Sequence, residues 1–576
     1  MPDDTAIVDF EGMGRLGFDR PAAVVEATRL SEVHAALARV EAWTRDGGWA
    51  VGFVSYEAAP AFDPALLVRG ESALPLLWFA LVDAPESSAP PPAAPPDAEP
   101  PGVWTPDVGR EAHADAVRAI RRAIGRGDVY QVNHTLRLHA RWRGDTRALY
   151  EMLRAAHQPR FGCWLRTGRH TLVSLSPELF VARDGDRLTT RPMKGTAPRG
   201  RFPEEDETRR DALVASEKER AENVMIVDLL RNDLGRIAIP GTVEVPELFA
   251  VERYPSVWQM TSTIRGALRP GTTLVEAFAA LFPCGSVTGA PKVAAMRAIA
   301  ALEDSPRGLY CGAIGVVRPG GDFTFSVAIR TLVADESTGE MSYGVGGGIT
   351  WDSSPTGEYE ELRAKGAALG ARRARALIET LRLEDGTYPL VSRHLVRLTS
   401  SAAHLGLAID ADAAARALHE HATAHSAGLW RVRLVAGDGV APVVTSTPLA
   451  AGPLEWRYAV AHTPVDERDV LLFHKTTERD VYDRHAAAHP GVDDVLLWNR
   501  AGELTEFTRG NLVLELDGER WTPPVRCGLL AGVQRGVLLD GGAIRERVVT
   551  RDELARASGV WLVNAVRGWV EMRAPA

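Results

Sequence analysis

Apolar stretches along the chain predict buried strands that alternate with helices. Residues 49–56 form an apolar run typical of a buried strand, and residues 172–182 and 323–333 show strand-like patterns. Residues 217–230 have the spacing of a helix. Because strands and helices alternate from about residue 110 to 370, the pattern favours a mixed α/β or α+β domain.

A second pattern begins near residue 375. We expect a long helix from about Glu358 to Leu377, which runs almost without a break into residues 379–386, where Asp-Gly predicts a hairpin turn. Residues 392–406 predict an amphipathic helix with a basic face. The boundary near residue 375 divides the chain into domains 1–375 and 376–576.

Composition adds limits to this division. A chain of 576 residues exceeds one hydrophobic core, so two large or three smaller domains are expected. The proline-dense residues 84–102 predict an extended surface segment without helix or ladder. A net charge of -9 with dispersed arginines argues against a nucleic-acid partner. The acidic start at residues 1–4 and the lack of any long apolar run indicate a cytoplasmic protein without membrane spans.

The four cysteines lie far apart in the sequence and show no ligand spacing. They therefore predict neither a disulfide framework nor a zinc site, and buried thiols are expected.

Two acidic pairs have the spacing of neighbours on one helix face. Glu219 and Glu222 are three residues apart, and so are Glu358 and Glu361, with Lys365 one turn beyond. Two such helices together could hold a hard divalent cation such as Mg²⁺. The alternative is that each pair is a solvated face that pairs with neighbouring arginines.

An amine and a carboxyl group suggest a nucleophile and an acid. Lys194 lies in a loop beside a glycine, and Glu178 precedes it by sixteen residues in a Ser-Pro-Glu-Leu-Phe run. An isolated loop lysine can equally be a solvated charge. Residues 282–292 form a Gly/Pro-punctuated loop before a helix, suited to a carboxylate, while Gly-rich residues 343–349 bring bare backbone close to another group. Arg330, a charge in an apolar strand pattern, needs a buried partner such as a substrate carboxylate.

These motifs, in this order, resemble the chorismate-utilising enzymes, which include anthranilate, isochorismate, salicylate and aminodeoxychorismate synthases. The resemblance covers roughly residues 1–370 and includes residues 127–133 and 228–235, the Gly-Ala-Pro-Lys loop, Ala-Ile-Arg-Thr and Glu-Tyr-Glu-Glu. It implies a two-sheet chorismate-binding sandwich with flanking helices. Within the family a lysine at position 194 is typical of the aminodeoxychorismate synthases, whereas anthranilate synthases carry a small residue there.

The resemblance also implies roles for individual residues. Lys194 would attack ring carbon 2 of chorismate while Glu178 protonates the departing 4-hydroxyl group, and ammonia would then enter at carbon 4. The implied Mg²⁺ ligands are Glu222 and Glu361, with Glu219 and Glu358 as helpers. The implied substrate-binding residues are Arg330, Lys365, Thr288 and Gly347. Because no cysteine lies in the Gly-x-Cys-x-Gly elbow of a glutamine amidotransferase, a separate glutaminase subunit would supply ammonia.

A second set of motifs, from about residue 380 to 574, resembles the class IV pyridoxal phosphate enzymes and, within them, aminodeoxychorismate lyase. The set includes His-Lys-Thr-Thr at 474–477, Gly-Glu-Leu-Thr-Glu at 502–506 and the run 530–535. It implies a class IV aminotransferase-like α+β domain. Lys475 would hold pyridoxal phosphate and carry a proton, and Glu506 would pair with the pyridinium nitrogen.

The phosphate of this cofactor would be bound by Arg397 and the Val533-Gln534 backbone, with Asn564-Ala565 as a further phosphate-side turn. The family's usual N-terminal strands, about two dozen residues, have no counterpart before residue 378. A homodimer through the C-terminal domain is also expected from this resemblance.

Together the two resemblances imply a bifunctional enzyme that forms p-aminobenzoate from chorismate through 4-amino-4-deoxychorismate. The alternative is an anthranilate synthase-like enzyme with a transaminase-like or non-catalytic regulatory C-terminal domain.

Overall fold

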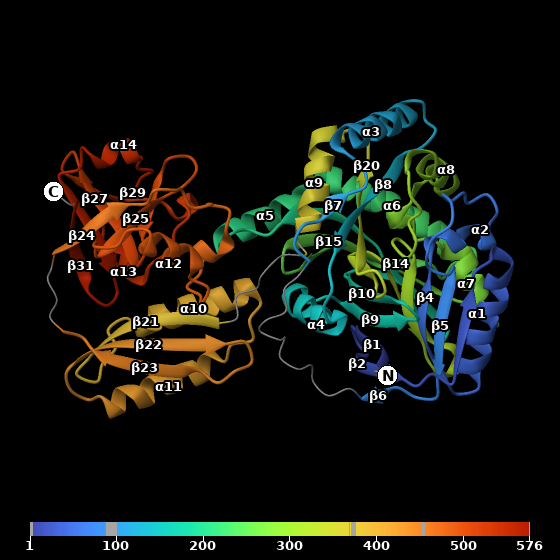
Figure 1. The fold of residues 1–576 in the computed structure, drawn as a ribbon, viewed down its shortest axis with the longest axis horizontal. Coiled ribbons are helices and arrows are strands. Elements are labelled where there is room, and N and C mark those ends of the chain that lie inside the picture. Colours follow the sequence, from blue (N-terminus) through green and yellow to red (C-terminus); the bar gives the residue numbers. More distant parts are fainter. Residues whose placement is uncertain (1–3, 88–100, 368, 370–375, 451–454, 575–576) are drawn as a thin grey trace. The chain divides into compact units, whose positions relative to one another are not determined.

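The computed structural model describes residues 4–87, 101–367, 369, 376–450 and 455–574. The chain divides into two compact units, which are described separately (Figure 1). The first comprises Met1–Pro198 and Arg209–Arg372, and the second comprises Arg199–Thr208 and Arg373–Ala576. The main division therefore falls near the expected boundary, but one internal segment of ten residues belongs to the second unit.

The first unit is built on two antiparallel sheets of ten strands each. In order, the first sheet contains β16 (Gly289–Ala290), β8 (Gln131–Arg141), β20 (Glu340–Ile349), β19 (Thr331–Asp335), β10 (His170–Ser176), β9 (Phe161–Thr167), β1 (Asp4–Phe10), β2 (Gly14–Asp19) and β6 (Glu86–Ser87), with β7 (Thr105–Pro106) beside β8. The second contains β13 (Met193–Pro198), β15 (Val257–Ala267), β12 (Arg187–Arg191), β11 (Leu179–Asp184), β18 (Phe323–Val327), β17 (Ala313–Val317), β4 (Trp49–Val54), β5 (Leu77–Val82) and β3 (Ala23–Ala27), with β14 (Glu244–Arg253) beside β15.

The two sheets pack face to face through alternating apolar side chains. Phe10, Phe161 and Leu172 of the first sheet share a buried cluster with Phe53 and Trp78 of the second. Each such side chain contributes about 1.5–3 kcal/mol when it is fully buried. The predicted α+β class and the two-sheet sandwich are confirmed. The packed core of the sandwich fixes the strands that carry the candidate site residues.

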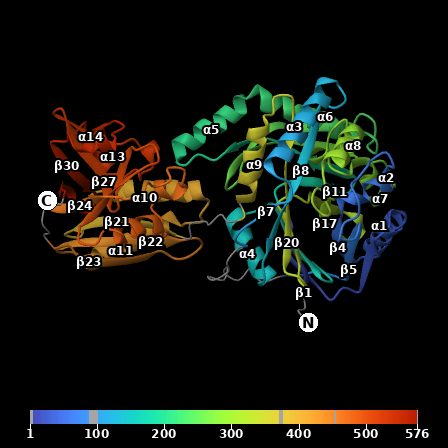
Figure 2. The same ribbon diagram turned by 45° about the horizontal axis from the view of Figure 1, so that its top comes forward.

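Helices cover the outer faces of both sheets (Figures 1 and 2). The second sheet is covered by α1 (Leu30–Arg45), α2 (Ala59–Phe62), α6 (Glu217–Gly235) and α7 (Leu274–Leu281). The first sheet is covered by α3 (Arg110–Gly125), α4 (Thr146–His157), α8 (Lys292–Leu302) and α9 (Pro355–Ala367). The remaining helix, α5 (Pro203–Ala215), begins in the second unit and ends in the first. In the described parts of the chain, no helix is both long and apolar enough to span a lipid bilayer.

Two predicted strands are each broken at a crossing between the sheets. The pattern at 172–182 forms β10 and β11, and the pattern at 323–333 forms β18 and β19. In both cases one strand belongs to the first sheet and the other to the second. The apolar alternation continues through the crossing because both strands face the shared core, so periodicity alone did not reveal the break.

Two other expectations were wrong. The helix expected over residues 358–377 is α9, which ends at Ala367, while residues 370–375 lie outside the described part. Leu377 lies in a strand, because its alternating apolar neighbours pair with another strand of the second unit. Within residues 84–102, Glu86–Ser87 form a short ladder with β2, whereas the proline-dense residues 88–100 are outside the described residues.

The second unit contains a small sheet and a closed barrel. The sheet has the order β21 (Ala376–Glu384), β22 (Leu429–Gly437) and β23 (Val443–Pro448), with α10 (Val391–Leu405) and α11 (Ala411–Ala424) packed on it. The predicted turn at Asp385-Gly386 and the predicted amphipathic helix, α10, are confirmed.

Pairing of β26 (Leu504–Phe507) with β27 (Gly510–Leu516) closes the barrel through β25 (Asp494–Trp498), β24 (Glu455–Val460), β31 (Gly568–Arg573) and β30 (Gly559–Asn564). Beside it lie β28 (Glu519–Thr522), β29 (Arg545–Glu546), α12 (Asp480–Ala487), α13 (Val533–Asp540) and α14 (Arg551–Leu554). Closure removes the open sheet edges of these six strands.

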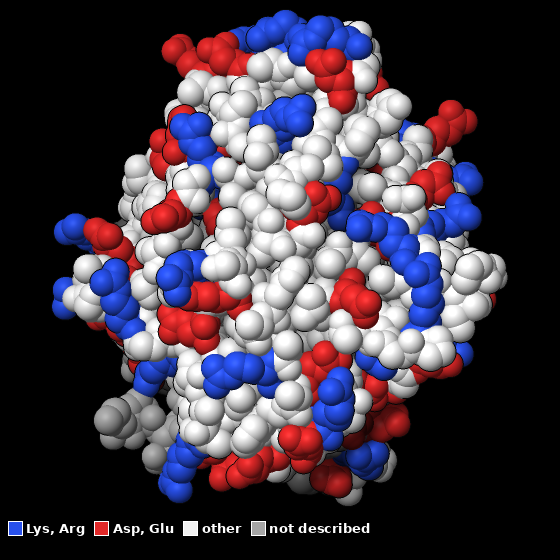
Figure 3. Space-filling view, turned by 90° about the vertical axis from the view of Figure 1, so that its right-hand side faces the viewer, with Lys and Arg blue, Asp and Glu red and all other residues white. Residues whose placement is uncertain are grey.

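Charged side chains are mixed over the face shown in Figure 3, where basic and acidic groups are interspersed with uncharged ones. All four cysteines are buried free thiols, as expected. Burial raises the pKa of the Cys284 thiol to about 12.

Candidate functional site

Lys194 lies at a bulge in an edge strand of the first unit. The pairing of β13 with β15 shifts register between Met193 and Thr196, and Gly195 has a φ of 96°. Such a bulge turns a side chain away from the regular pleat. On α6, the amide of Asn223 donates to the Lys194 carbonyl at 3.0 Å and accepts from Ser262 at 2.6 Å. The predicted loop is therefore a β-bulge whose backbone is held by α6.

The Lys194 amine faces the glycine-rich strand β20. A Cβ atom added to Gly348 would lie 3.2 Å from Lys194 Nζ and 2.2 Å from Gln131 Nε2. On the same strand, a Cβ added to Gly347 would lie 3.1 Å from Glu358 Oε2. The expected close approach to bare backbone is therefore confirmed, and a side chain at position 348 would have to displace the Gln131 amide.

Glu178 and Arg330 lie at the two neighbouring crossings between the sheets. The Glu178 carbonyl accepts from Val327 N at 3.0 Å, and the Arg330 carbonyl accepts from Leu175 N at 3.0 Å. Arg330 has a φ of 51°, which interrupts the strand in which the sequence pattern had placed it. It is partly buried, and its charge acts on the buried phenols of Tyr254 and Tyr343.

Burial changes the acid–base properties of the amine and of the Glu178 carboxyl group. Burial raises the pKa of Glu178 to about 7, although a hydrogen bond from Ser286 and the charge of Lys194 oppose this effect. Burial lowers the pKa of Lys194, against the opposing charges of Glu178 and Glu222. The environment thus shifts both pKa values in the direction that a general acid and an amine nucleophile require.

The two acidic pairs lie on α6 and α9, as predicted. Burial raises the pKa values of Glu222 and Glu358, and the neighbouring carboxylates Glu219 and Glu361 raise them further. For Glu361, the charge and hydrogen bond of Lys365 outweigh burial and lower the pKa. Lys365 Nζ lies 2.7 Å from Glu361 Oε1 and donates to the Gly346 carbonyl at 2.7 Å.

This set of carboxylates suits a hard divalent cation in its donor chemistry. Repulsion among the carboxylates would be relieved by such an ion, and Mg²⁺ commonly takes one or two protein carboxylates together with water and substrate oxygens. Among the described residues, no three His, Cys, Asp or Glu side chains converge closely enough to enclose a metal ion.

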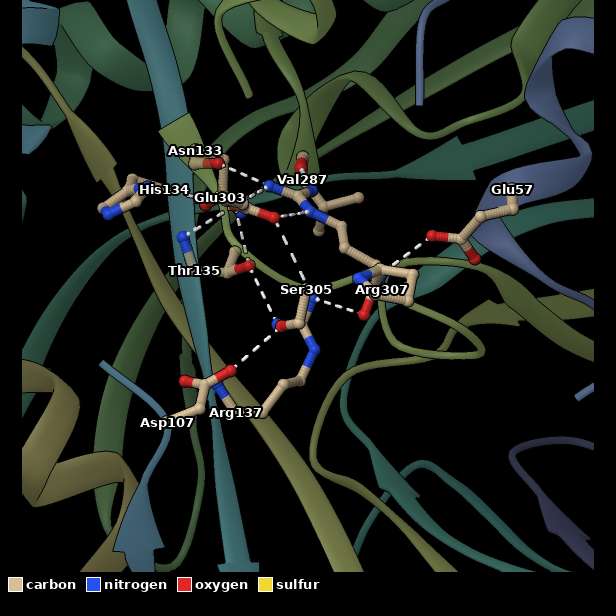
Figure 4. Close-up of polar contacts among 11 residues, drawn as sticks. Glu57, Asp107, Asn133, His134, Thr135, Arg137, Val287, Glu303, Ser305 and Arg307 are labelled. Carbon is tan, nitrogen blue, oxygen red and sulfur yellow. Dashed lines mark hydrogen bonds and ion pairs between the residues drawn. The ribbon is translucent and has the colours of Figure 1, made fainter. Parts of the chain in front are cut away.

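A buried ion pair holds β8 to the loop that contains Thr288 (Figure 4). Arg307 donates to Glu303 Oε1 at 2.7 Å, to the Val287 carbonyl at 2.8 Å and to the Asn133 carbonyl at 2.7 Å. Thr288 is fully buried, and its hydroxyl donates to the Cys284 carbonyl at 3.2 Å. The hydroxyl of this predicted substrate-binding residue thus bonds within its own loop.

In the second unit, Lys475 lies in a cavity of about 690 Å³. The lining includes the predicted cofactor-binding residues Arg397, Glu506, Val533 and Gln534, and also Asn564 and Ala565. Burial, with Arg397 and Arg479 nearby, lowers the pKa of Lys475 to about 8. Ile378 N donates to the Lys475 carbonyl at 2.8 Å, so β21 holds the main chain at this lysine.

The carboxyl group of Glu506 is fixed by three donors. Tyr482 Oη donates to it at 2.9 Å, Asn511 Nδ2 at 3.2 Å and Leu530 N at 3.2 Å. Burial raises its pKa to about 7. Glu506 and Lys475 both line the cavity, and a carboxyl group and an amine in one cavity fit the chemistry of pyridoxal phosphate.

Arg397 is held by a buried carboxylate. Its Nε donates to Glu379 Oε1 at 2.9 Å, and His394 Nδ1 lies 2.6 Å from Glu379 Oε2. Burial would raise the pKa of Glu379, but the charge of Arg397 and the hydrogen bonds from His394 and Arg397 lower it to about 2. Arg397 and the N-terminus of α13 at Val533 both line the cavity, which fits a bound phosphate.

A family model described as "chorismate binding enzyme" matches residues 6–370. The chain belongs to the chorismate-binding enzyme family. A second model, "amino-transferase class IV", matches residues 376–574. The two matches meet near residue 375, and this chorismate-binding enzyme therefore carries a class IV aminotransferase domain.

Curated relatives resemble the first part of this chorismate-binding enzyme. Aminodeoxychorismate synthase component 1 of Escherichia coli is 42% identical over 258 residues, which cover 45% of this chain and 56% of the relative. Anthranilate synthase component 1 of Thermus thermophilus is 42% identical over 263 residues, covering 46% and 56%. The chain thus spans about half the length of the curated relatives it matches.

Two solved structures share the fold of the first unit. Anthranilate synthase component I of Streptococcus pneumoniae has a TM-score of 0.53 at 26% identity, covering 64% of this chain and 91% of that protein. The menaquinone-specific isochorismate synthase of Escherichia coli has a TM-score of 0.51 at 17% identity, covering 64% and 89%. The second likeness concerns the fold alone.

Sequence reasoning missed three groups in this chorismate-binding enzyme. Gln131, whose buried side-chain oxygen and nitrogen have no hydrogen-bond partner among the described residues, lies beside Lys194. Ser286 bonds Glu178, and the Arg307–Glu303 pair holds the loop. Gln131 lies inside the motif at 127–133, so its position there was a usable signal. The ion pair gave no comparable signal, because Glu and Arg four residues apart usually mark an exposed helix face.

Proposed function

We propose that the first unit aminates chorismate to 4-amino-4-deoxychorismate and that the second removes pyruvate to give p-aminobenzoate. The observation that carries this proposal is the Lys194 amine, held at a bulge beside Gly348 and Gln131 with the buried acid Glu178 nearby. The aminodeoxychorismate synthase of Escherichia coli and the anthranilate synthase of Thermus thermophilus are each 42% identical to the chain, so the choice between the two activities rests on Lys194.

Lys194 and Glu178 would divide one substitution into two. The neutral Lys194 amine attacks ring carbon 2, both ring double bonds shift, and the 4-hydroxyl group leaves as water after Glu178 donates a proton. Ammonia then attacks carbon 4, both double bonds shift back, and the lysine amine leaves carbon 2. The sum is chorismate plus ammonia to aminodeoxychorismate plus water.

The acidic pairs would hold Mg²⁺, with Glu222 and Glu361 as ligands and Glu219 and Glu358 in support. The ion would organise the ring carboxylate of the substrate. Arg330 and Lys365 would bind substrate carboxylates, for which Lys365 must exchange its present contact with Glu361. Thr288 would support the loop, and Gly347 would leave room for the substrate.

Ammonia would come from a separate glutamine amidotransferase. All four cysteines of the chain are buried, and burial raises their pKa values, whereas a nucleophilic cysteine needs an accessible thiolate. A partner subunit that hydrolyses glutamine would therefore complete the reaction.

In the second unit Lys475 would hold pyridoxal phosphate and then move the proton that aromatisation releases. Glu506 would hold the proton on the pyridinium nitrogen, while Arg397 and the Val533-Gln534 backbone would bind the phosphate. When bound, the cofactor supplies an electron sink that allows pyruvate to be eliminated. We assign this role to the domain at 376–576 and the amination to the domain at 1–375, with a homodimer formed through the second.

The alternative is an anthranilate synthase-like enzyme whose second unit has no catalytic role, a reading favoured by the equal identity to anthranilate synthase. Incubation of the purified chain with chorismate, Mg²⁺ and ammonia, followed by product identification, separates the two proposals. We expect aminodeoxychorismate or p-aminobenzoate, and anthranilate would support the alternative.

The variant Lys194→Ala tests the proposed nucleophile. We expect it to lose p-aminobenzoate formation, because no other amine replaces the first attack. Unchanged p-aminobenzoate production by this variant would refute the role of Lys194.

A further inference from the structure

Ten residues from the region matched by the chorismate-binding family belong to the second unit. Arg199–Thr208, here called the anchor segment, begins directly after β13 and includes the start of α5. Lys194 precedes the anchor segment in β13, and Glu219 follows it in α6. The anchor segment nevertheless packs within the second unit, which contains Lys475.

The side chain of Phe202 enters an apolar cluster of the second unit. Its ring stacks on Phe473 with centroids 5.3 Å apart, and it packs against the cluster that contains Leu472 and Tyr482. The Arg201 guanidinium lies beside both rings, 5.1 Å from the centre of the Phe473 ring and 5.8 Å from the centre of the Phe202 ring. Phe473 thus contacts two side chains of the anchor segment.

Arg201 makes polar contacts through both its side chain and its main chain. Its guanidinium donates to the Glu467 carbonyl at 2.9 Å and to the Arg526 carbonyl at 3.2 Å. Its own carbonyl lies 3.2 Å from His474 Nε2. A carbonyl can only accept, so His474 Nε2 carries the proton, and Nδ1 accepts from the Ser401 hydroxyl at 3.0 Å.

The anchor segment is itself rigidly folded. The buried carboxylate of Asp206 accepts from Arg199 Nε at 2.7 Å and from Gly200 N at 2.8 Å. The adjacent His474 ring stacks on His404 with centroids 4.6 Å apart. The segment therefore presents the Arg201 carbonyl and the Phe202 ring to residues 473–474 in one defined arrangement.

We propose that Arg201 and Phe202 are positioning residues for Lys475 and act through Phe473 and His474. Lys475 directly follows this pair, so the direction of its side chain depends on how the main chain at 473–474 is fixed. The inference rests on the proposed function of Lys475 as the cofactor-binding lysine. The cofactor site of the second unit would then depend on two residues from the region that matches the chorismate-binding family.

The test uses the full-length chain and the variants Phe202→Ala and Arg201→Ala. The control is Arg210→Ala, since Arg210 is on the same helix α5 and forms an exposed ion pair with Asp211. Amide hydrogen exchange of the peptide that contains residues 473–475 is measured without cofactor. The dissociation constant of pyridoxal phosphate and the pH midpoint of its bound absorbance band are measured by titration.

We expect faster exchange, about fivefold weaker pyridoxal phosphate binding and a shifted pH midpoint in both variants but not in the control. Phe202→Tyr, which keeps the ring stack, should restore all three. Wild-type values for exchange and pH midpoint in both Phe202→Ala and Arg201→Ala would overturn the inference. A wild-type chain that binds no pyridoxal phosphate would contradict the proposed function instead, while the exchange measurement would still decide the positioning role.

Discussion

The pKa values of Lys194 and Glu178 are shifted in opposite directions by the same cause. Burial disfavours charge on both groups, so it lowers the pKa of the amine and raises that of the carboxyl group. Each charge partly opposes the effect of burial on the other. Both shifts are in the direction that the proposed acid and nucleophile require.

The raised pKa of Glu178 predicts the pH dependence of amination. The acid is active only when protonated, so kcat for chorismate consumption should fall as pH rises through about 7. Glu178→Gln should lower kcat by roughly a hundredfold to ten-thousandfold and abolish that alkaline decline. Steady-state rates with ammonia in excess, from pH 6 to 9, provide the measurement.

The control for this experiment is Glu111→Gln, at an exposed position on α3, which should keep the wild-type profile. A Glu178→Gln enzyme with the wild-type rate and the same decline would exclude Glu178 as the acid.

For single residues, the sequence indicated a candidate role where the residue belongs to a motif. Lys194, Glu178 and Lys475 were selected in this way, and burial shifts the pKa of each, while their roles stay predictions. The position of Arg330 was misread because its left-handed backbone conformation at a crossing leaves no mark in an apolar pattern. The nearness of Gln131 to Lys194 depends on strand pairing, which a single sequence does not display.

Among the elements, the crossings between sheets matter most for the first site. Two neighbouring connections, from β10 to β11 and from β18 to β19, place Glu178 and Arg330 at the same level of the sandwich. Element types were largely predictable because the sandwich strands and α6 have strong periodicity. The ends of the elements were less predictable. The helix expected to reach residue 377 overlapped the strand β21, whose pairing partner β22 lies about fifty residues further along the chain.

The buried Arg307–Glu303 pair should be essential to the packing of β8 against the Thr288 loop. Glu303→Gln leaves the Arg307 charge buried without its counter-charge, so we expect the free energy of unfolding to fall by about 3–5 kcal/mol. Urea unfolding of the full-length chain, followed by tryptophan fluorescence, measures this loss.

A matched comparison uses the exposed pair formed by Arg141 and Glu340, whose side chains are 85% and 61% exposed. Glu340→Gln should change the free energy of unfolding by less than about 1 kcal/mol. Equal losses for the two substitutions would show that burial does not determine the contribution of the Arg307–Glu303 pair.

For the whole molecule, two sites with separate lysines predict separable half-reactions. Lys475→Ala should accumulate aminodeoxychorismate, because the first unit retains Lys194 and only the elimination is lost. Lys194→Ala should form p-aminobenzoate only when aminodeoxychorismate is added. Chromatography of reactions with chorismate, Mg²⁺ and ammonia distinguishes these products.

Mixing the two variants should restore p-aminobenzoate formation if the intermediate diffuses between molecules. A mixture that forms none, while both variants remain folded, would contradict independent half-reactions.

The division into two units was predictable near residue 375, where the hydrophobic pattern changes. The place of the anchor segment in the second unit was not predictable, because Arg199–Thr208 is mostly polar. Its only large apolar side chain, Phe202, stacks on Phe473, far away in the sequence. Pairings over such sequence distances are decided by tertiary packing.

Because of the anchor segment, the two units of this protein do not correspond to two continuous stretches of sequence. The chain passes from the first unit to the second at Pro198, returns after Thr208 and passes over again near Arg372. A gene cut at the family boundary would encode a second domain without the phenylalanine that stacks on Phe473. Recombination that exchanges one domain would also have to exchange ten residues inside the other, so the two halves are expected to be inherited together.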